Sequence, residues 1–179
     1  MFRQSGTAYF QPVAGVAYRT CQTIQAMKQT NFSITIVIPA PQPVVWSVIS
    51  DIERWPEWTP SIFRVKKLSA GPLQVGSRAR VHQPKLPPAY WRVTEFSPGV
   101  RFTWVSVAPG VRVTARHEVQ GTANGCVATL SIDYEGLLGG LLARWVGELN
   151  HRYLTMEANG LKSRCTEWVA KSTLEYHEA

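Results

Sequence analysis

The chain has 179 residues, of which 45% are hydrophobic and 17% are charged, and its formal net charge is +7. This length and composition indicate one globular domain with a hydrophobic core, and they exclude a disordered chain. The basic residues are scattered, with Lys66-Lys67 as the only adjacent pair, so they indicate a solvated surface and not a nucleic-acid site.

Residues 1–30 contain basic side chains but no acidic one, and they lack the apolar core and cleavage site of a secretory signal. We interpret this segment as a disordered tail or as an extension of the gene model, with Met27 as the biological start. Removal of residues 1–26 is then expected to leave stability and binding intact.

Residues 32–38 alternate apolar and polar side chains and predict a strand with one buried face. The prolines that follow end this strand and predict a short helix from about Pro43 to Ile49. Ser50 and Glu53 have the spacing of a capping box, which predicts a second short helix. This helix should be brief, because Pro56 disfavours helical geometry at the residue before it.

Six further strands are predicted between breaks that contain glycine, proline or both. Their regular spacing is typical of an antiparallel meander. They cover Ile62–Leu68, Ser77–Gln83, Tyr90–Phe96, Arg101–Val107, Val111–Gln120 and Val127–Glu135. From about Gly140 to Ala170, apolar residues recur mostly every three to five positions and predict one long amphipathic helix. A sheet with one apolar face needs a cover, and this helix can supply it.

The cysteines, Cys21, Cys126 and Cys165, are far apart and form no Cys-x-x-Cys pair. Their spacing argues against a disulfide framework and a structural zinc site, and it is typical of the reducing cytosol. No stretch reaches the roughly 18 apolar residues of a membrane-spanning helix. We therefore expect a cytoplasmic protein with no metal, no cofactor and no integral membrane association.

Several motifs resemble those of the polyketide cyclase/dehydrase-like family in the START-like (SRPBCC) superfamily. The most specific is Val44-Val45-Trp46 followed by the tryptophan-rich run Ser50–Trp58, and others are Gly76–Val81, Tyr90–Glu95 and Leu130–Gly136. The resemblance covers roughly residues 33–170. It implies an α+β helix-grip fold, in which a curved antiparallel seven-stranded sheet wraps around a long C-terminal helix and two short helices follow the first strand. The START-like domain is then expected over residues 31–172, with a C-terminal tail over residues 173–179.

In helix-grip proteins the sheet and the long helix enclose a cavity, so inward-facing residues become candidates for ligand contact. Strand parity places these residues on one face of the sheet, and Trp58 is expected near the cavity mouth. For each of them, plain core packing is an equally good interpretation. The candidates are Trp58, Val81, Trp91, Val93, Phe102, Trp104, Ala115, His117, Leu130, Tyr134, Leu149, Tyr153 and Met156.

His117 is the candidate for catalysis, because its parity places an ionisable side chain among apolar neighbours. It could anchor a ligand or act as a general acid or base. The interpretation that we favour is a core histidine bonded to a backbone carbonyl or a buried water. Near the expected entrance, Asp51 and Glu53 suit a helix start, and Arg54 should form a local ion pair with Glu57.

No nucleophile motif, no pair of metal ligands and no glycine-rich phosphate loop is present in the sequence. Three functions remain open. The first is binding, and possibly transport, of a small hydrophobic molecule such as a lipid or polyketide-like metabolite. The second is a cyclase or aromatase-like enzyme, and the third is a protein-interaction module. The oligomeric state is left open.

Overall fold

The computed structural model describes residues 30–177, which form a seven-stranded antiparallel sheet, two short helices and a long C-terminal helix. The predicted α+β helix-grip class is confirmed, including the two short helices after the first strand. The expectations about residues 1–29, among them Met27 as the start, lie outside the described residues.

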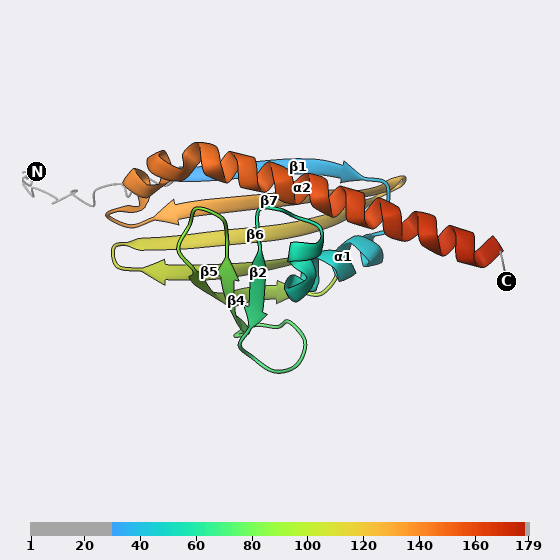
Figure 1. Ribbon diagram of the computed structural model, residues 1–179, viewed down its shortest axis with the longest axis horizontal. Helices are drawn as coiled ribbons and strands as arrows, with labels where there is room; N and C mark the ends of the chain where they lie inside the picture. Colours follow the sequence, from blue (N-terminus) through green and yellow to red (C-terminus); the bar gives the residue numbers. More distant parts are fainter. Residues whose placement is uncertain (1–29, 178–179) are drawn as a thin grey trace, which may run out of the picture.

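The sheet is a meander of β2 to β7, and the first strand of the chain joins it beside the last. Its spatial order is β1-β7-β6-β5-β4-β3-β2, so β2 to β7 pair with their neighbours in the chain and β1 pairs with β7. Figure 1 shows β2 lying steeply across the direction of β5, β6 and β7, so the sheet is strongly twisted and one face is concave. The strands are β1 (Thr30–Ile38), β2 (Arg64–Lys67), β3 (Arg78–His82), β4 (Ala89–Ser97), β5 (Arg101–Ala108), β6 (Val111–Thr122) and β7 (Gly125–Glu135).

Two short helices, α1 (Gln42–Ser50) and the 3-10 helix η1 (Ile52–Glu57), follow β1. The predicted capping box between Ser50 and Glu53 is wrong. Because α1 continues through Ser50, the hydroxyl of this residue donates to the Trp46 carbonyl at 2.7 Å. The Glu53 carboxylate accepts a hydrogen bond from the Lys67 backbone N–H at 3.0 Å. Glu53 therefore ties η1 to strand β2 and does not cap a helix.

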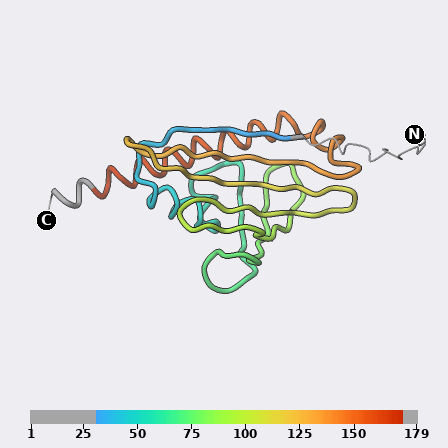
Figure 2. Tube along the Cα trace, turned by 180° about the vertical axis from the view of Figure 1, so that it is seen from behind, coloured from blue at the N-terminus to red at the C-terminus, as the bar shows by residue number. Residues whose placement is uncertain are grey.

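The long helix α2 (Gly139–His177) runs diagonally along the sheet, and its C-terminal end projects past the strands (Figures 1 and 2). It is longer than the predicted helix, which ended near Ala170. No glycine or proline follows Gly160 in the sequence, so nothing in the chain interrupts the helical pattern there.

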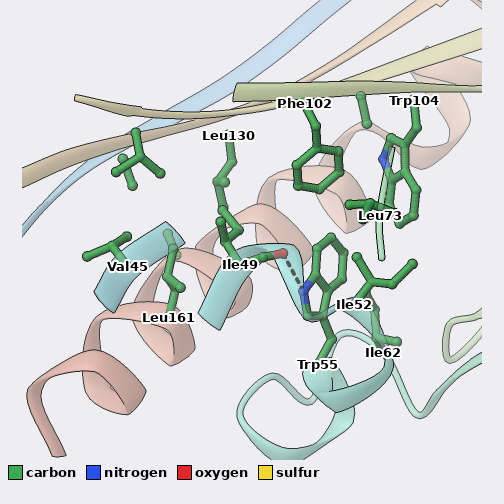
Figure 3. Packing of buried hydrophobic residues seen from close by; sticks show 14 of the residues in the cluster. Val45, Ile49, Ile52, Trp55, Ile62, Leu73, Phe102, Trp104, Leu130 and Leu161 are labelled. Carbon is green, nitrogen blue, oxygen red and sulfur yellow. Dashed lines mark hydrogen bonds between the residues drawn. The ribbon is translucent and has the colours of Figure 1, made fainter. Parts of the chain in front are cut away.

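A core of buried residues fills one end of the space between the sheet and α2 (Figure 3). Trp55 of η1 lies at its centre, and the Trp55 indole Nε1–H donates to the Ile49 carbonyl of α1 at 3.0 Å. The same indole packs against Phe102 and Trp104 of β5. A smaller cluster surrounds Tyr134 near the start of α2. Residues from both clusters line one cavity, which therefore lies between them.

Candidate functional site

The cavity has a volume of about 330 Å³ and lies between the concave face of the sheet and α2. Its walls come from β3 to β7, the β3–β4 loop, Trp55, Ile62 and the first half of α2. Most of the wall residues are apolar. Tyr90 and Val107 line the cavity and are also 61% and 70% exposed, so the cavity opens to solvent beside β4 and β5. This is the arrangement of a small-molecule site.

The β3–β4 loop closes one side of the cavity against α2. Leu86, Pro87 and Pro88 of this loop are wall residues. The Tyr153 hydroxyl donates a hydrogen bond from α2 to the Pro84 carbonyl, which fastens the loop to the helix. Burial raises the pKa of the Tyr153 hydroxyl, and the nearby Arg152 partly opposes this shift. Tyr153 therefore stays protonated at neutral pH and remains a hydrogen-bond donor.

A second polar link joins the sheet to α2 at Tyr134 and Asn150. The Tyr134 hydroxyl donates to Asn150 Oδ1 at 3.0 Å, and both side chains are buried wall residues. Burial raises the pKa of Tyr134, and the bond to Asn150 partly offsets that effect. Asn150 Nδ2 is buried and has no hydrogen-bond partner among the described residues. This amide is a spare donor in the cavity wall.

A buried acid–imidazole pair lies where β6 faces α2. His117 Nε2 is 3.0 Å from Glu157 Oε1, and their side chains are only 5% and 9% exposed. The imidazole stacks on Phe102, with 4.5 Å between the ring centroids and 13° between the planes. His117 Nδ1 has no partner among the described residues. His117 is buried, as a core histidine would be, but the partner of its Nε2 atom is a carboxylate and not a backbone carbonyl.

The predicted ligand contacts fall into two groups in the structure. Seven lie in the cavity wall: Val81, Trp91, Trp104, Ala115, His117, Tyr134 and Tyr153. Six do not: Val93, Phe102 and Leu130 are buried in the core, Leu149 and Met156 are half-buried on α2, and Trp58 is half-buried against Trp55. Trp58 was expected at the cavity mouth, but it does not line the cavity. Its indole packs against Trp55, and its backbone carbonyl lies against Gly160 of α2.

Sequence reasoning missed Asn150 and Glu157, two of the three polar wall residues that α2 contributes. They lie three positions before and four positions after Tyr153, so all of these residues share one helix face. Helical periodicity could have found them. The β3–β4 loop had no comparable signal, because its prolines indicated only a break between strands.

Near the expected entrance, Glu57 of η1 forms ion pairs that have a structural role. Arg54 and Glu57 form the predicted ion pair, with 2.8 Å between Nε and Oε1. Glu57 also accepts from Arg164 of α2 at 3.0 Å. The hydrogen bond from Arg54 lowers the pKa of the Glu57 carboxyl. These contacts join η1 to α2 on the outside of the molecule, away from the cavity wall.

Among residues 30–177, no group of three or more histidine, cysteine, aspartate or glutamate side chains could hold a metal ion. Within the same range, no helix is long and apolar enough to cross a membrane.

A family model described as polyketide cyclase/dehydrase and lipid transport matches residues 29–166. None of the curated proteins matches the sequence.

Solved structures with the same fold include an aromatase/cyclase and a plant protein. The Zhui aromatase/cyclase from Streptomyces sp. R1128 is 16% identical, with a TM-score of 0.65, and the match covers 79% of this chain and 96% of that one. Ginseng major latex-like protein 151 from Panax ginseng is 14% identical, with a TM-score of 0.63 and coverage of 76% and 97%. A protein from Thermus thermophilus is 19% identical, with a TM-score of 0.62 and coverage of 77% and 98%. At these identities the matches show the fold.

Proposed function

Because the chain belongs to the polyketide cyclase/dehydrase and lipid transport family, we propose that it binds a small hydrophobic molecule in the cavity between the sheet and α2. The resemblance drawn from the sequence motifs is confirmed by this membership. The observation that carries the proposal is the cavity of about 330 Å³ with mostly apolar walls. Filling such a cavity removes apolar surface from water on both partners, which favours binding.

The walls favour a compact, flat ligand with a polar end. The indoles of Trp91 and Trp104 lie 5.1 Å apart with 30° between their planes, and they offer broad aromatic surfaces. Among the polar wall groups, Asn150, Tyr153 and Glu157 come from a single face of α2. A volume near the lower end of the usual range of roughly 300–1,000 Å³ favours one or two rings over a two-chain lipid.

The first test fills the cavity by substitution. Ala115→Phe places a benzyl group at a wall position, and binding of the uncharged naphthalene dye N-phenyl-1-naphthylamine is followed by fluorescence. The dissociation constant should rise by at least about tenfold. The matched control is Ala70→Phe, at an exposed position between β2 and β3, and it should bind as the unmodified chain does.

Thermal melts must show that both variants are folded, because an added ring can overpack a site. Equal dye affinity in two folded variants would contradict binding in this cavity.

A second candidate function is a dehydrase or cyclase activity, and the buried pair of His117 and Glu157 favours it. In dehydration of a β-hydroxyketone, His117 Nδ1 would take the proton from the carbon beside the carbonyl. The same proton would then pass to the departing hydroxyl, so that an enone and one water form. Glu157 would hold the imidazole in place and stabilise its cation through Nε2–H.

A naphthyl β-hydroxyketone tests this candidate, because its enone product absorbs at longer wavelength. For an enzyme, His117→Ala should lower turnover by roughly 10²-fold or more while dye binding changes little. Glu157→Gln keeps the shape of the acid but removes its charge, and it should also lower turnover. Absence of turnover in the unmodified chain would contradict this dehydration and leave ligand binding as the proposed function.

We also propose a reducing, cytoplasmic location. The support is that Cys126 and Cys165 are buried free thiols, and that no disulfide occurs in the described part of the chain.

A further inference from the structure

Large apolar side chains are exposed where α2 begins. Leu137, Leu141 and Trp145 are 90%, 64% and 86% exposed, and Leu138 is 51% exposed. Val107 of β5, at 70%, lies at the same end of the sheet, because the β5–β6 turn and the first turns of α2 meet there (Figure 1). We name these five residues the α2 patch. A cluster of this kind marks an interaction surface more often than scattered apolar residues do.

The α2 patch is continuous with the cavity. A groove of about 500 Å³ runs between the β5–β6 turn and α2, and Leu141 and Trp145 form part of its wall. Ala108, Val111 and Leu142 line both this groove and the cavity. The patch residue Val107 is itself a cavity wall residue. A molecule that leaves the cavity on this side therefore meets the α2 patch first.

Basic side chains lie beside the cavity wall, and two of them, Arg112 and Arg144, also adjoin residues of the groove. Lys85, Arg112, Arg144 and Arg152 are exposed, and each lies one or two positions from a cavity wall residue. None of them forms an ion pair with another described residue. Two acidic residues lie close to these basic ones: Glu135 is the cross-strand partner of Arg112, and Glu148 lies between Arg144 and Arg152 on α2. Because Arg112 follows Val111 and Arg144 precedes Trp145, basic side chains border the α2 patch.

We propose that the α2 patch docks on the surface of an anionic lipid bilayer and exchanges the hydrophobic ligand with it through the groove. This inference rests on the proposed ligand binding. Trp145 and the leucines would enter the headgroup region, where tryptophan is favoured, while the arginines contact lipid phosphates. A second copy of the chain fits this face less well, because a two-fold contact would bring Arg112 and Arg144 of both copies together.

The test uses the full chain and sedimented vesicles of phosphatidylcholine, with and without about one-third phosphatidylserine. The unmodified chain should bind the anionic vesicles, and the bound fraction should fall as salt is raised. Trp145→Glu and Leu141→Glu should each lower the partition coefficient by about tenfold or more. The matched control is Trp168→Glu, near the other end of α2 and 50% exposed, which should bind as the unmodified chain does.

Equal vesicle binding by all of these variants, or no binding by the unmodified chain, would overturn the proposal. A change from dimer to monomer in Trp145→Glu, with vesicle binding unchanged, would assign the patch to a second copy instead. Binding of N-phenyl-1-naphthylamine without vesicles separates the two proposals. Leu137→Glu changes a patch residue that lines neither the groove nor the cavity, so it should lower vesicle binding but keep dye binding. Loss of docking alone then leaves the cavity function intact, whereas no dye binding by the unmodified chain rejects that function.

Discussion

The replacement of Trp55 by phenylalanine tests how η1 is held against the sheet. The Trp55 indole is 1% exposed, donates to the Ile49 carbonyl at 3.0 Å and packs against Trp104 at 5.3 Å between ring centroids. It also forms part of the cavity wall. Phenylalanine keeps an aromatic ring at the site but removes the N–H and part of the packed surface.

Two contributions set the size of the effect. The Ile49 carbonyl loses its indole donor in a buried setting, which costs about 1–3 kcal/mol. The smaller ring loses contacts worth about 1 kcal/mol. The free energy of unfolding should therefore fall by about 2–4 kcal/mol, which in a chain of this size lowers the melting temperature by about 4–16 °C.

Trp58→Phe is the matched control, three residues further along the chain. The Trp58 Nε1 atom is buried and has no hydrogen-bond partner among the described residues. Removing an unpaired N–H relieves a desolvation cost, so the free energy of unfolding should change by less than about 1 kcal/mol. Urea unfolding followed by circular dichroism measures both variants. Equal losses in the two would refute the role given to the bond between Trp55 and Ile49.

Two further predictions concern close packing and burial. Gly160→Ala should destabilise the protein although alanine favours helices, because a Cβ atom there would clash with the Trp58 carbonyl oxygen. Gly147→Ala in the same helix meets nothing closer than 3.5 Å and should stabilise by up to about 1 kcal/mol; equal thermal shifts would contradict this pair. Burial raises the pKa of the Cys165 thiol to about 12, whereas the thiol of the unfolded chain ionises near pH 8.5. The contribution of the protonated thiol to the free energy of unfolding is therefore complete below about pH 8.5 and is lost as the pH rises toward about 12. Between about pH 8 and 10, the free energy of unfolding should fall less in Cys165→Ala than in the unmodified chain, and identical slopes would exclude this linkage.

Turn residues and period-two alternation were enough to place the strands. Gly99, Gly110 and Gly136 adopt positive φ angles at breaks between strands or before α2, as their positions indicated. The predicted and observed ends of β5 to β7 coincide or differ by at most two residues. These signals are local, so they can be found in the sequence without knowing what packs on the sheet.

The site was less predictable, because its polar groups depend on how α2 lies over the sheet. Parity correctly placed His117 on the buried face, but only the docking of α2 brings Glu157 to within 3.0 Å of it. Parity also could not separate cavity from core. Phe102 and Trp104 share one face of β5, yet Phe102 is packed beneath η1 and α1 and only Trp104 reaches the cavity.

Native mass spectrometry of the gently purified full chain is the most direct test of ligand binding in the cavity. We expect one small organic molecule per chain in the unmodified protein, with occupancy strongly reduced in Ala115→Phe and unchanged in Ala70→Phe. A mass that stays at that of the bare chain after incubation with excess N-phenyl-1-naphthylamine would contradict ligand binding in this cavity. Equal occupancy in the folded Ala115→Phe variant would contradict it as well.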